Sequence, residues 1–478
     1  MSGYERLSVQ DRLHLDIEDE NVHTHVAGVF IFDAAALTRE EGGIDFDRIC
    51  EFIDSRLFRI PRYRQRVVRV PIEGHPFWVD DPGFNLLYHV RHTRLPLPGD
   101  ERQLKRLVGR IVSQKLDRGK PLWELWIVEG FDEDRFAAVI KVHHCMADGI
   151  AATELIQTLL SVEPEESFEP PPAWLPAPVP AGRELLESSL RSRLTSPFTL
   201  ARSLFKAAGK PDETMESIRE GIESLRRARE VQTTTASGTP FNLPIGPYRR
   251  FDWLQCAFED VRKIRKGIGG TVNDVILATV AGAVSRFFEQ RGIPSLEQGD
   301  MDFRVAVPVN IRPPGDHSVS GNFVSSLIVP IPLAEPDPRI RLERVIEATR
   351  QAKSSGTDLA VQITQTASDW TWPGLYGVFA QQMVDRRTSN MIVSDIPGPR
   401  ADLYLLGARL QEAYPLGPLL AEQALGIACF SYADKLFWGF NSEWELMPDL
   451  HDFVTAIERS FDELCEAADK VQQVKSEG

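Results

Sequence analysis

The chain has 478 residues, of which 42% are hydrophobic and 26% are charged, and its formal net charge is −15. This composition is typical of a globular protein with roughly two to four domains. The negative charge disfavours nucleic acid as a partner, because it would repel the phosphate backbone.

The sequence also argues against export, membrane insertion and a disulfide framework. The longest apolar run, 275–284, is about half as long as a membrane-spanning helix, and the N-terminus has no apolar signal core. The five cysteines are scattered and lack CxxC spacing, which is typical of a reducing compartment. We therefore expect a cytoplasmic protein without a structural zinc site.

Residues 1–165 alternate strand-like and helix-like segments, which predicts an α+β layered domain. Apolar, β-branched runs predict strands at 26–32, 123–128 and 136–142. A helical spacing of apolar residues follows at 150–160.

The sequence His-His-Cys-Met-Ala-Asp-Gly stands at 143–149, between the last of these strands and the helix. Because side chains alternate along a strand, His144 is expected on the face of Ile140 and Val142, and His143 on the face of Lys141. A neutral imidazole in a partly apolar channel can take a proton from an alcohol and return it to a leaving thiolate. The pattern therefore favours acyl transfer with His144 as general base and His143 as a structural residue.

The remaining motif residues are expected to shape the turn into the helix. Asp148 and Gly149 stand where that helix begins. Asp148 is counted among the catalytic residues. Its carboxylate is expected either to stabilise the turn or to pair with an arginine elsewhere in the chain.

A metal site and a cysteine nucleophile fit this motif less well. The two histidines face opposite ways, and no further His or Cys cluster supplies ligands. Cys145 would need an activating base and alternates away from His144. We predict direct transfer without an acyl-enzyme and without a metal.

Residues 166–240 are predicted to link two domains. Seven prolines between Pro164 and Pro180 indicate a stiff, extended segment. The helical pattern that follows is basic and amphipathic, and it either lies on an anionic lipid surface or packs on its own domain.

Residues 241–470 return to an α+β pattern and form the second domain. Strands are predicted at 303–309 and 323–329, and Asp274 is predicted to cap a helix that ends near Gln290.

Several segments in the same order resemble the wax ester synthase/diacylglycerol acyltransferase family, which belongs to the CoA-dependent acyltransferases with an HHxxxDG motif. Besides 143–149, the resemblance rests on 7–13, 25–28, 121–124, 273–274, 307–313, 321–323, 396–399 and 431–434. It implies an α+β fold of two chloramphenicol-acetyltransferase-like domains with a tunnel between them. It also implies that a segment at about 390–440 crosses to extend the N-terminal sheet.

The resemblance implies transfer of a fatty acyl group from acyl-CoA to a long-chain alcohol, giving a wax ester, or to diacylglycerol, giving triacylglycerol. Acyl-CoA is a substrate, so no cofactor is expected. Peripheral association with a membrane or a lipid droplet is compatible with the basic segment. Two alternatives stay open: a condensation-domain-like enzyme with a carrier-bound acyl donor, and a non-catalytic lipid-binding protein.

Attack on a thioester creates an oxyanion that requires hydrogen-bond donors placed in advance. Asn273 is the first candidate, because it precedes a predicted helix N-terminus; alternatively, it shapes the start of that helix with Asp274. Ser394 is the second candidate for such a donor and is placed with the substrate-binding residues; alternatively, the Pro-Gly-Pro turn after it serves only to direct the chain. The residue after Ser394 is Asp395, where the family usually has asparagine.

Two residues of the predicted N-terminal strands are candidates for the substrate path. Trp123 either lines the acyl path or packs in the core. Gly28 either leaves room for a chain or reflects tight packing of the strand.

Overall fold

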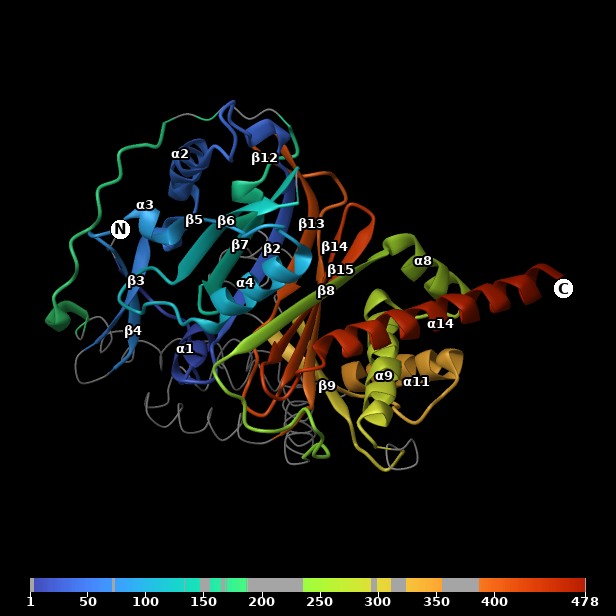
Figure 1. Ribbon diagram of the computed structural model, residues 1–478. Helices are drawn as coiled ribbons and strands as arrows, with labels where there is room; N and C mark the ends of the chain where they lie inside the picture. The colour runs from blue at the N-terminus through green and yellow to red at the C-terminus, as the bar shows by residue number, and fades with distance from the viewer. Residues whose placement is uncertain are drawn as a thin grey trace, which may run out of the picture.

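The computed structural model describes residues 4–70, 74–132, 134–146, 155–164, 168, 170–185, 187, 235–293, 299–310, 324–354 and 387–477. Within them, two six-stranded sheets and one three-stranded sheet form the framework, with helices on their faces (Figure 1). The small sheet has the order β1-β4-β3. Its strands are β1 (Tyr4–Arg6), β3 (Gln65–Arg69) and β4 (Pro76–Asp80).

The N-terminal sheet has the order β12-β13-β2-β7-β6-β5. Its strands are β2 (His25–Asp33), β5 (Val90–Arg94), β6 (Trp123–Phe131), β7 (Arg135–His143), β12 (Tyr404–Leu405) and β13 (Ala408–Leu416). The helices of this half are α1 (Val9–Asp16), α2 (Phe46–Arg56), α3 (Leu86–His89) and α4 (Glu101–Ser113). Residues 155–159 are also helical. The predicted strands at 26–32, 123–128 and 136–142 are therefore confirmed.

The C-terminal sheet has the order β10-β9-β11-β14-β15-β8. Its strands are β8 (Arg249–Ala257), β9 (Arg304–Asn310), β10 (Val324–Pro330), β11 (Met391–Pro397), β14 (Leu425–Tyr432) and β15 (Lys435–Glu443). The helices are α8 (Phe258–Gly267), α9 (Val272–Gln290), α11 (Pro338–Ser354) and α14 (Leu450–Glu477). The predicted strands at 303–309 and 323–329 are confirmed with a shift of one residue.

The two faces of the C-terminal sheet have different neighbours. Alternate residues such as Val393 and Ile427 belong to a core shared with α8, α9, α11 and α14. Residues of the other face, such as Phe430 and Phe437, belong to the core of the N-terminal half. The second sheet therefore packs between its own helices and the first half of the molecule.

The segment that crosses from one sheet to the other is β12 with β13. These strands lie inside the range 390–440, whereas β11, β14 and part of β15, in the same range, stay in the C-terminal sheet. The crossing is tight at Gly439, because a Cβ there would lie 1.7 Å from the carbonyl oxygen of Pro415 on β13. Nearby, the rings of Trp253 and Tyr414 stack with centroids 4.7 Å apart. These contacts join the two sheets.

The start of α9 differs from the prediction. Thr271, and not Asp274, is the N-cap, because its side chain accepts a hydrogen bond from the Asp274 N–H. Asp274 occupies the third helical position and accepts from the N–H of Thr271 at 2.8 Å, which completes a capping box. Both signals were in the sequence, but the box begins three residues earlier than predicted.

Of the predicted linker, 166–240, the structure describes residues 168, 170–185, 187 and 235–240. Residues 170–180 have neither helix nor strand, and 182–185 form a short helical piece. The basic amphipathic stretch after 187 lies outside the described residues.

In the described part of the chain, no single helix is long and apolar enough to cross a membrane. Helices α8 and α9 have the length and composition of a membrane span only when they are counted together, and they are bent by 94° relative to each other. Most of α9 is buried in the C-terminal core.

Candidate active site

The histidine pair lies where β7 ends. In the register of β7 with β2, His143 lies opposite His25 and Lys141 opposite Ala27. His143 therefore shares the face of Lys141, as predicted. His144 follows the strand, and its main-chain N–H donates to the carbonyl oxygen of Thr24 at 2.8 Å. His143 is buried, whereas His144 is partly exposed.

His143 is fixed by hydrogen bonds on both sides of its ring. Its Nδ1 accepts from the N–H of Cys145 at 3.2 Å, so the ring proton of the neutral form belongs on Nε2. That Nε2 lies 2.9 Å from Thr24 Oγ1 and 3.3 Å from Glu18 Oε2. Burial lowers the pKa of His143 despite the nearby carboxylate. These contacts support the structural role predicted for this residue.

Thr24 connects the strand pair to α1. Its hydroxyl donates to the carbonyl oxygen of His14 at 2.8 Å, which leaves its lone pairs for the His143 ring. Its own carbonyl oxygen holds the His144 N–H. One fully buried threonine therefore contacts three histidines.

Glu18 carries the charge of this network. Burial acts to raise the pKa of Glu18, but hydrogen bonds from His143 and Arg118 outweigh it and lower that pKa to about 2. Arg118 also donates to the carbonyl oxygen of Leu15 at 2.8 Å. The buried carboxylate is thus ionised and held against α1 and β7 together.

His14 stacks on His144. The ring centroids are 4.0 Å apart and the ring planes differ by 17°. Burial, followed by the charge that His144 acquires on protonation, lowers the pKa of His14 well below its usual value. His14 presents a neutral, flat ring to one side of His144. Its position follows from α1, which Ser8 caps by accepting the Asp11 N–H at 3.0 Å.

Cys145 is buried, and burial raises the pKa of its thiol well above the usual value. A thiol in this state is a poor nucleophile at neutral pH. This environment supports the prediction against a cysteine nucleophile.

Trp123 is packed on several sides. Its Nε1 donates to the carbonyl oxygen of Tyr63 at 2.7 Å, and its ring stacks on His89 with centroids 4.7 Å apart. It is 3% exposed. These contacts favour the packing alternative over a substrate contact.

The space above Gly28 is filled by a neighbouring side chain. A Cβ at position 28 would lie 2.9 Å from Phe30 Cε2 and 3.8 Å from Ile140 Cγ2. The missing side chain therefore makes room for the ring of Phe30 in this structure.

Ser394 and its neighbour lie on opposite faces of β11. Ile396 contacts the core of the N-terminal half, and Ser394 shares its face by alternation. Asp395 lies on the face of Val393, opposite Cys429 in the register. Burial raises the pKa of Asp395 to about 6. The Asp395 side chain, which replaces the usual asparagine, therefore points toward the helix layer and not toward the N-terminal half.

Asn273 and Asp274 lie in the first turn of α9, and α9 packs against α8, α11 and α14. The Oδ1 of Asn273 is buried and has no hydrogen-bond partner among the described residues. The described contacts do not connect Asn273 with the histidine pair. Its role as an oxyanion donor stays a prediction.

Asp148 and Gly149 lie outside the described residues, so their predicted roles are also untested. Sequence reasoning missed His14, Glu18 and Thr24 as parts of the site. The segment 7–13 was used only for the family resemblance. The histidine that directly follows it, His14, was a signal for the site that could have been used. Among the described residues, no group of three or more His, Cys, Asp or Glu side chains is arranged to hold a metal ion.

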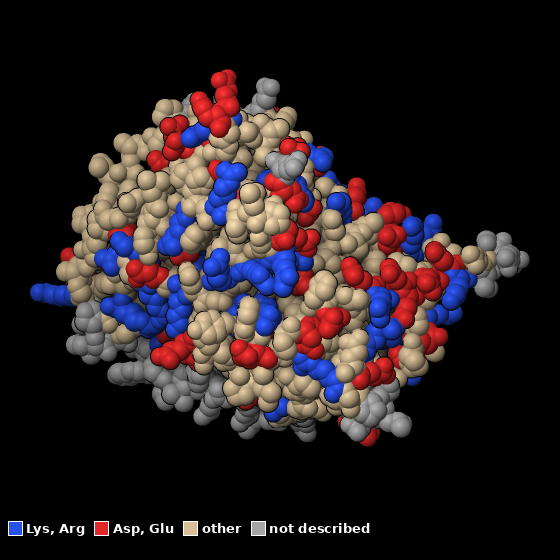
Figure 2. All heavy atoms as spheres, in the orientation of Figure 1, with Lys and Arg blue, Asp and Glu red and all other residues tan. Residues whose placement is uncertain are grey.

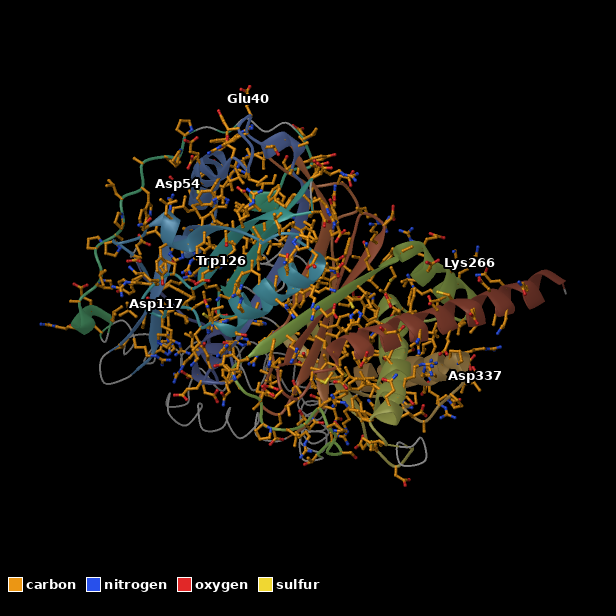
Figure 3. All side chains as sticks on the ribbon, in the orientation of Figure 1. Glu40, Asp54, Asp117, Trp126, Lys266 and Asp337 are labelled. Carbon is orange, nitrogen blue, oxygen red and sulfur yellow. The ribbon has the colours of Figure 1, made fainter. Side chains whose placement is uncertain are left out.

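Basic side chains are distributed unevenly over the surface. Lys and Arg gather over α4 (Figure 2), where Arg102, Arg106 and Arg110 are exposed at intervals of four residues. Lys266 lies on α8, in the part of the molecule far from the labelled Asp54 and Trp126 of the N-terminal half (Figure 3).

Comparison with known proteins agrees with the resemblance. Residues 7–276 match the wax ester synthase/diacylglycerol acyltransferase catalytic domain, and residues 320–465 match the C-terminal domain of the same family. A putative diacylglycerol O-acyltransferase of Mycobacterium tuberculosis is 30% identical over 98% of this chain and 91% of its own length.

Solved structures agree on the fold. The wax ester synthase/diacylglycerol acyltransferase from Marinobacter aquaeolei VT8 has a TM-score of 0.67 at 24% identity and covers 97% of this chain and 100% of its own. The first condensation domain of the CDA synthetase has a TM-score of 0.59 at 14% identity and covers 97% of this chain and 96% of its own. The two-domain α+β fold is thus confirmed. The chain belongs to the wax ester synthase/diacylglycerol acyltransferase family and is an acyltransferase of that type.

Proposed function

We propose that this enzyme transfers a fatty acyl group from acyl-CoA to a long-chain alcohol or to diacylglycerol, with His144 as the general base. The single observation that supports the assignment of the base is that the two histidines of the pair have different surroundings. His143 is buried and bonded through both ring nitrogens, whereas His144 is partly exposed and stacked on a neutral ring.

In the proposed reaction, the acceptor hydroxyl oxygen attacks the thioester carbonyl carbon while His144 takes the hydroxyl proton. The tetrahedral intermediate collapses, the C–S bond breaks, and His144 returns the proton to the CoA thiolate. The products are an ester and free CoA. Acid–base catalysis of this kind contributes about 10²–10⁴-fold.

The neighbouring residues would act by holding His144 in place. Thr24 fixes its main chain, and His14 supports one side of its ring. Asn273 is proposed to stabilise the oxyanion, and Asp148 to stabilise the turn after the motif. Peripheral association with a lipid surface is part of the proposal, supported by the exposed arginines of α4.

The experiment is ester formation from palmitoyl-CoA with hexadecanol and, separately, with a diacylglycerol. Unmodified protein is compared with His144→Ala and with His144→Gln, which keeps a polar side chain. Product from the unmodified protein alone supports the proposal, and the product ratio identifies the acceptor. Equal activity in all three proteins would refute the base assignment.

An absence of product from the unmodified protein would refute the use of free acyl-CoA. A carrier-bound acyl donor in the same assay would then test the condensation-domain alternative. Binding of lipid without turnover of either donor would favour the lipid-binding alternative.

A further inference from the structure

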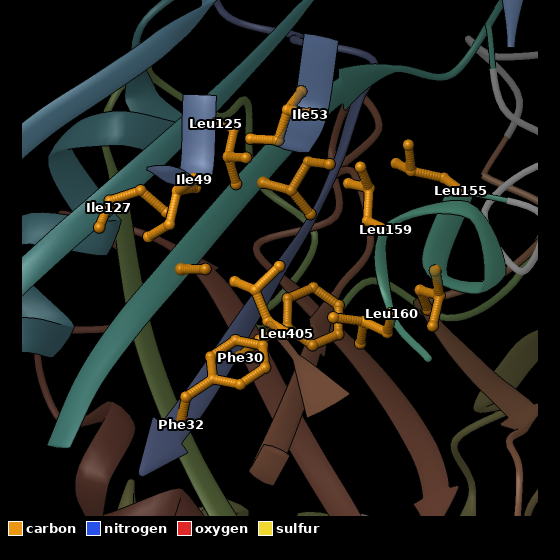
Figure 4. A pocket seen from close by; sticks show the side chains of 13 residues that line it. Phe30, Phe32, Ile49, Ile53, Leu125, Ile127, Leu155, Leu159, Leu160 and Leu405 are labelled. Carbon is orange, nitrogen blue, oxygen red and sulfur yellow. The ribbon is translucent and has the colours of Figure 1, made fainter. Parts of the chain in front are cut away.

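The N-terminal half contains a partly open apolar cavity of about 50 Å³ (Figure 4). Thirteen side chains line it, and all are hydrocarbon. The sheet contributes Phe30 and Phe32 from β2, Leu125 and Ile127 from β6, and Ala138 and Ile140 from β7. Such a cavity offers water no hydrogen-bond partner and suits only an apolar ligand.

The opposite wall comes from two helical segments. Ile49 and Ile53 project from α2, and Leu155 and Leu159 project from the segment that follows the histidine motif (Figure 4). The cavity and the motif are therefore connected through the same stretch of chain.

The cavity also lies on the strand that leads to the histidine pair. Ile140 lines it, and His144 stands four residues further along, at about 13 Å for a rise of about 3.3 Å per residue. Ile140 and Val142 share the face predicted for His144. This face therefore leads from the cavity toward His144.

The ring of Phe30 lies across that route. Its Cε2 and Cζ would be 2.9 Å and 3.1 Å from a Cβ at Gly28, so the ring leans over Gly28, toward the end of β2 where Thr24 and His25 lie. The same ring lines the cavity. Rotation of this side chain would join the cavity to the space above Gly28.

We propose that this cavity binds the distal part of a substrate's hydrocarbon chain, and that Phe30 over Gly28 sets the chain length that reaches it. The inference rests on the proposed acyl transfer at His144. It differs from the tunnel between domains that the family resemblance implies, because the cavity lies inside the N-terminal half.

Filling the cavity tests the proposal. Ala138→Leu adds a branched side chain to its sheet wall, and Leu159→Phe enlarges a side chain from the helical wall. Ile127→Leu, which keeps the lining volume, is the matched control. Melting temperatures establish that each variant is folded.

The donor series is butyryl-CoA, octanoyl-CoA and palmitoyl-CoA with one fixed acceptor. A butyryl group is too short to span about 13 Å. If the acyl chain occupies the cavity, either filling variant lowers kcat/KM for palmitoyl-CoA at least about tenfold, because each excluded methylene costs about fourfold in binding. Butyryl-CoA should change less than about twofold. Phe30→Ala should move the preference toward longer chains.

An acceptor series of hexanol and hexadecanol with butyryl-CoA separates the two sources of hydrocarbon. A selective loss of hexadecanol turnover in the filling variants would place the acceptor chain in the cavity. Equal effects on short and long chains in both series, or no effect in folded variants, would overturn the proposal.

Failure of the proposed function gives a different result, since the unmodified protein would then form no ester from any donor. Binding of palmitate, measured by calorimetry on unmodified protein and Ala138→Leu, still tests the cavity in that case. Weaker binding to the filled variant supports it, and equal binding overturns it.

Discussion

A carboxylate lies beside each of the two six-stranded sheets, and the pKa values of these two groups shift in opposite directions. Glu18, at the N-terminal sheet, receives hydrogen bonds from His143 and Arg118, which bring its pKa to about 2. Asp395, on the C-terminal sheet, is affected by burial, which raises its pKa to about 6. The carboxylate at the first sheet is held by charged and polar partners, whereas the carboxylate at the second sheet lies on the side of the helix-facing core.

The same contrast appears in the space around the sheets. The N-terminal sheet keeps an apolar cavity beside the strand that ends at the histidine pair. Four helices cover one face of the C-terminal sheet, and the other face packs against the N-terminal half of the molecule. One sheet thus carries the proposed chemistry, and the other supports it from behind. Substitutions at each sheet test this division.

The largest expected effect is on turnover in His144→Ala. We expect a loss of roughly 10²-fold or more, because the base for the acceptor hydroxyl is removed. The melting temperature should stay close to that of the unmodified protein, because His144 is partly exposed. Steady-state kinetics and a thermal melt measure both. A variant that loses stability and activity together would assign His144 a structural role.

The next largest effect is expected in Thr24→Val, which keeps the shape but removes the hydroxyl. His143 Nε2 loses a partner, and the carbonyl oxygen of His14 loses its donor. We expect a loss of about 1–3 kcal/mol in the free energy of unfolding, measured with denaturant, together with lower turnover. Thr24→Ser retains the hydroxyl and should recover most of both. If Thr24→Val were as stable and active as the unmodified protein, the network would not position the site.

The third prediction concerns acid stability. The folded-state pKa of Glu18, about 2, lies below its ordinary value of 4.5. Its contribution is therefore present above pH 4.5 and is lost as the pH falls toward 2. Glu18→Gln should cost about 1–2 kcal/mol at pH 7, allowing for solvent screening, and should flatten the dependence below pH 4.5. Melts across this range measure the effect.

Above pH 4.5, histidines with lowered pKa values should dominate the pH dependence of stability in both the unmodified protein and Glu18→Gln. Burial lowers the pKa values of His14, His25 and His143 below the ordinary 6.5. The unfolded chain then binds more protons, so stability should decrease as the pH falls below 6.5. A constant melting temperature between pH 6.5 and 4.5 would contradict this expectation.

A smaller effect is expected from the ring that supports His144. His14→Phe preserves a flat side chain at the stacking position and should retain kcat within about threefold, whereas His14→Ala should lower kcat about tenfold. Kinetics of both variants across pH separate support of the ring from a proton-transfer role. A shifted pH profile in His14→Phe with unchanged folding would show that His14 itself takes part in proton transfer.

The smallest effect on activity is expected in Asp395→Asn. The folded-state pKa of Asp395, about 6, lies above its ordinary 3.8, so its stabilising effect is present below pH 3.8 and is lost as the pH rises through 6. The substitution should raise stability at pH 7 by about 1 kcal/mol and leave turnover within about twofold. A strong change in acceptor selectivity would mean that the C-terminal sheet shapes the site directly.

The sequence predicted much of the fold because its strands have strong local signals. The apolar runs that become β2, β6 and β7 could be located to within three residues at each end. The start of α9 was less certain, since Thr271 and Asp274 share one capping box and either residue can be read as the cap. For the site, alternation along β7 correctly placed His143 on the face of Lys141, whereas the surroundings of His144, which follows the strand, came only from the structure.

The sequence by itself determined the family, the α+β class and the central histidine motif, because these depend on local patterns and on the order of motifs along the chain. Only the tertiary structure decided that His14, Glu18 and Thr24 surround the histidine pair and that Phe30 fills the space over Gly28. The physical reason is that these contacts join separate elements through stacking, hydrogen bonds and side-chain packing. Such contacts depend on how the N-terminal sheet and α1 pack against each other. The spacing of residues along the chain does not determine that packing.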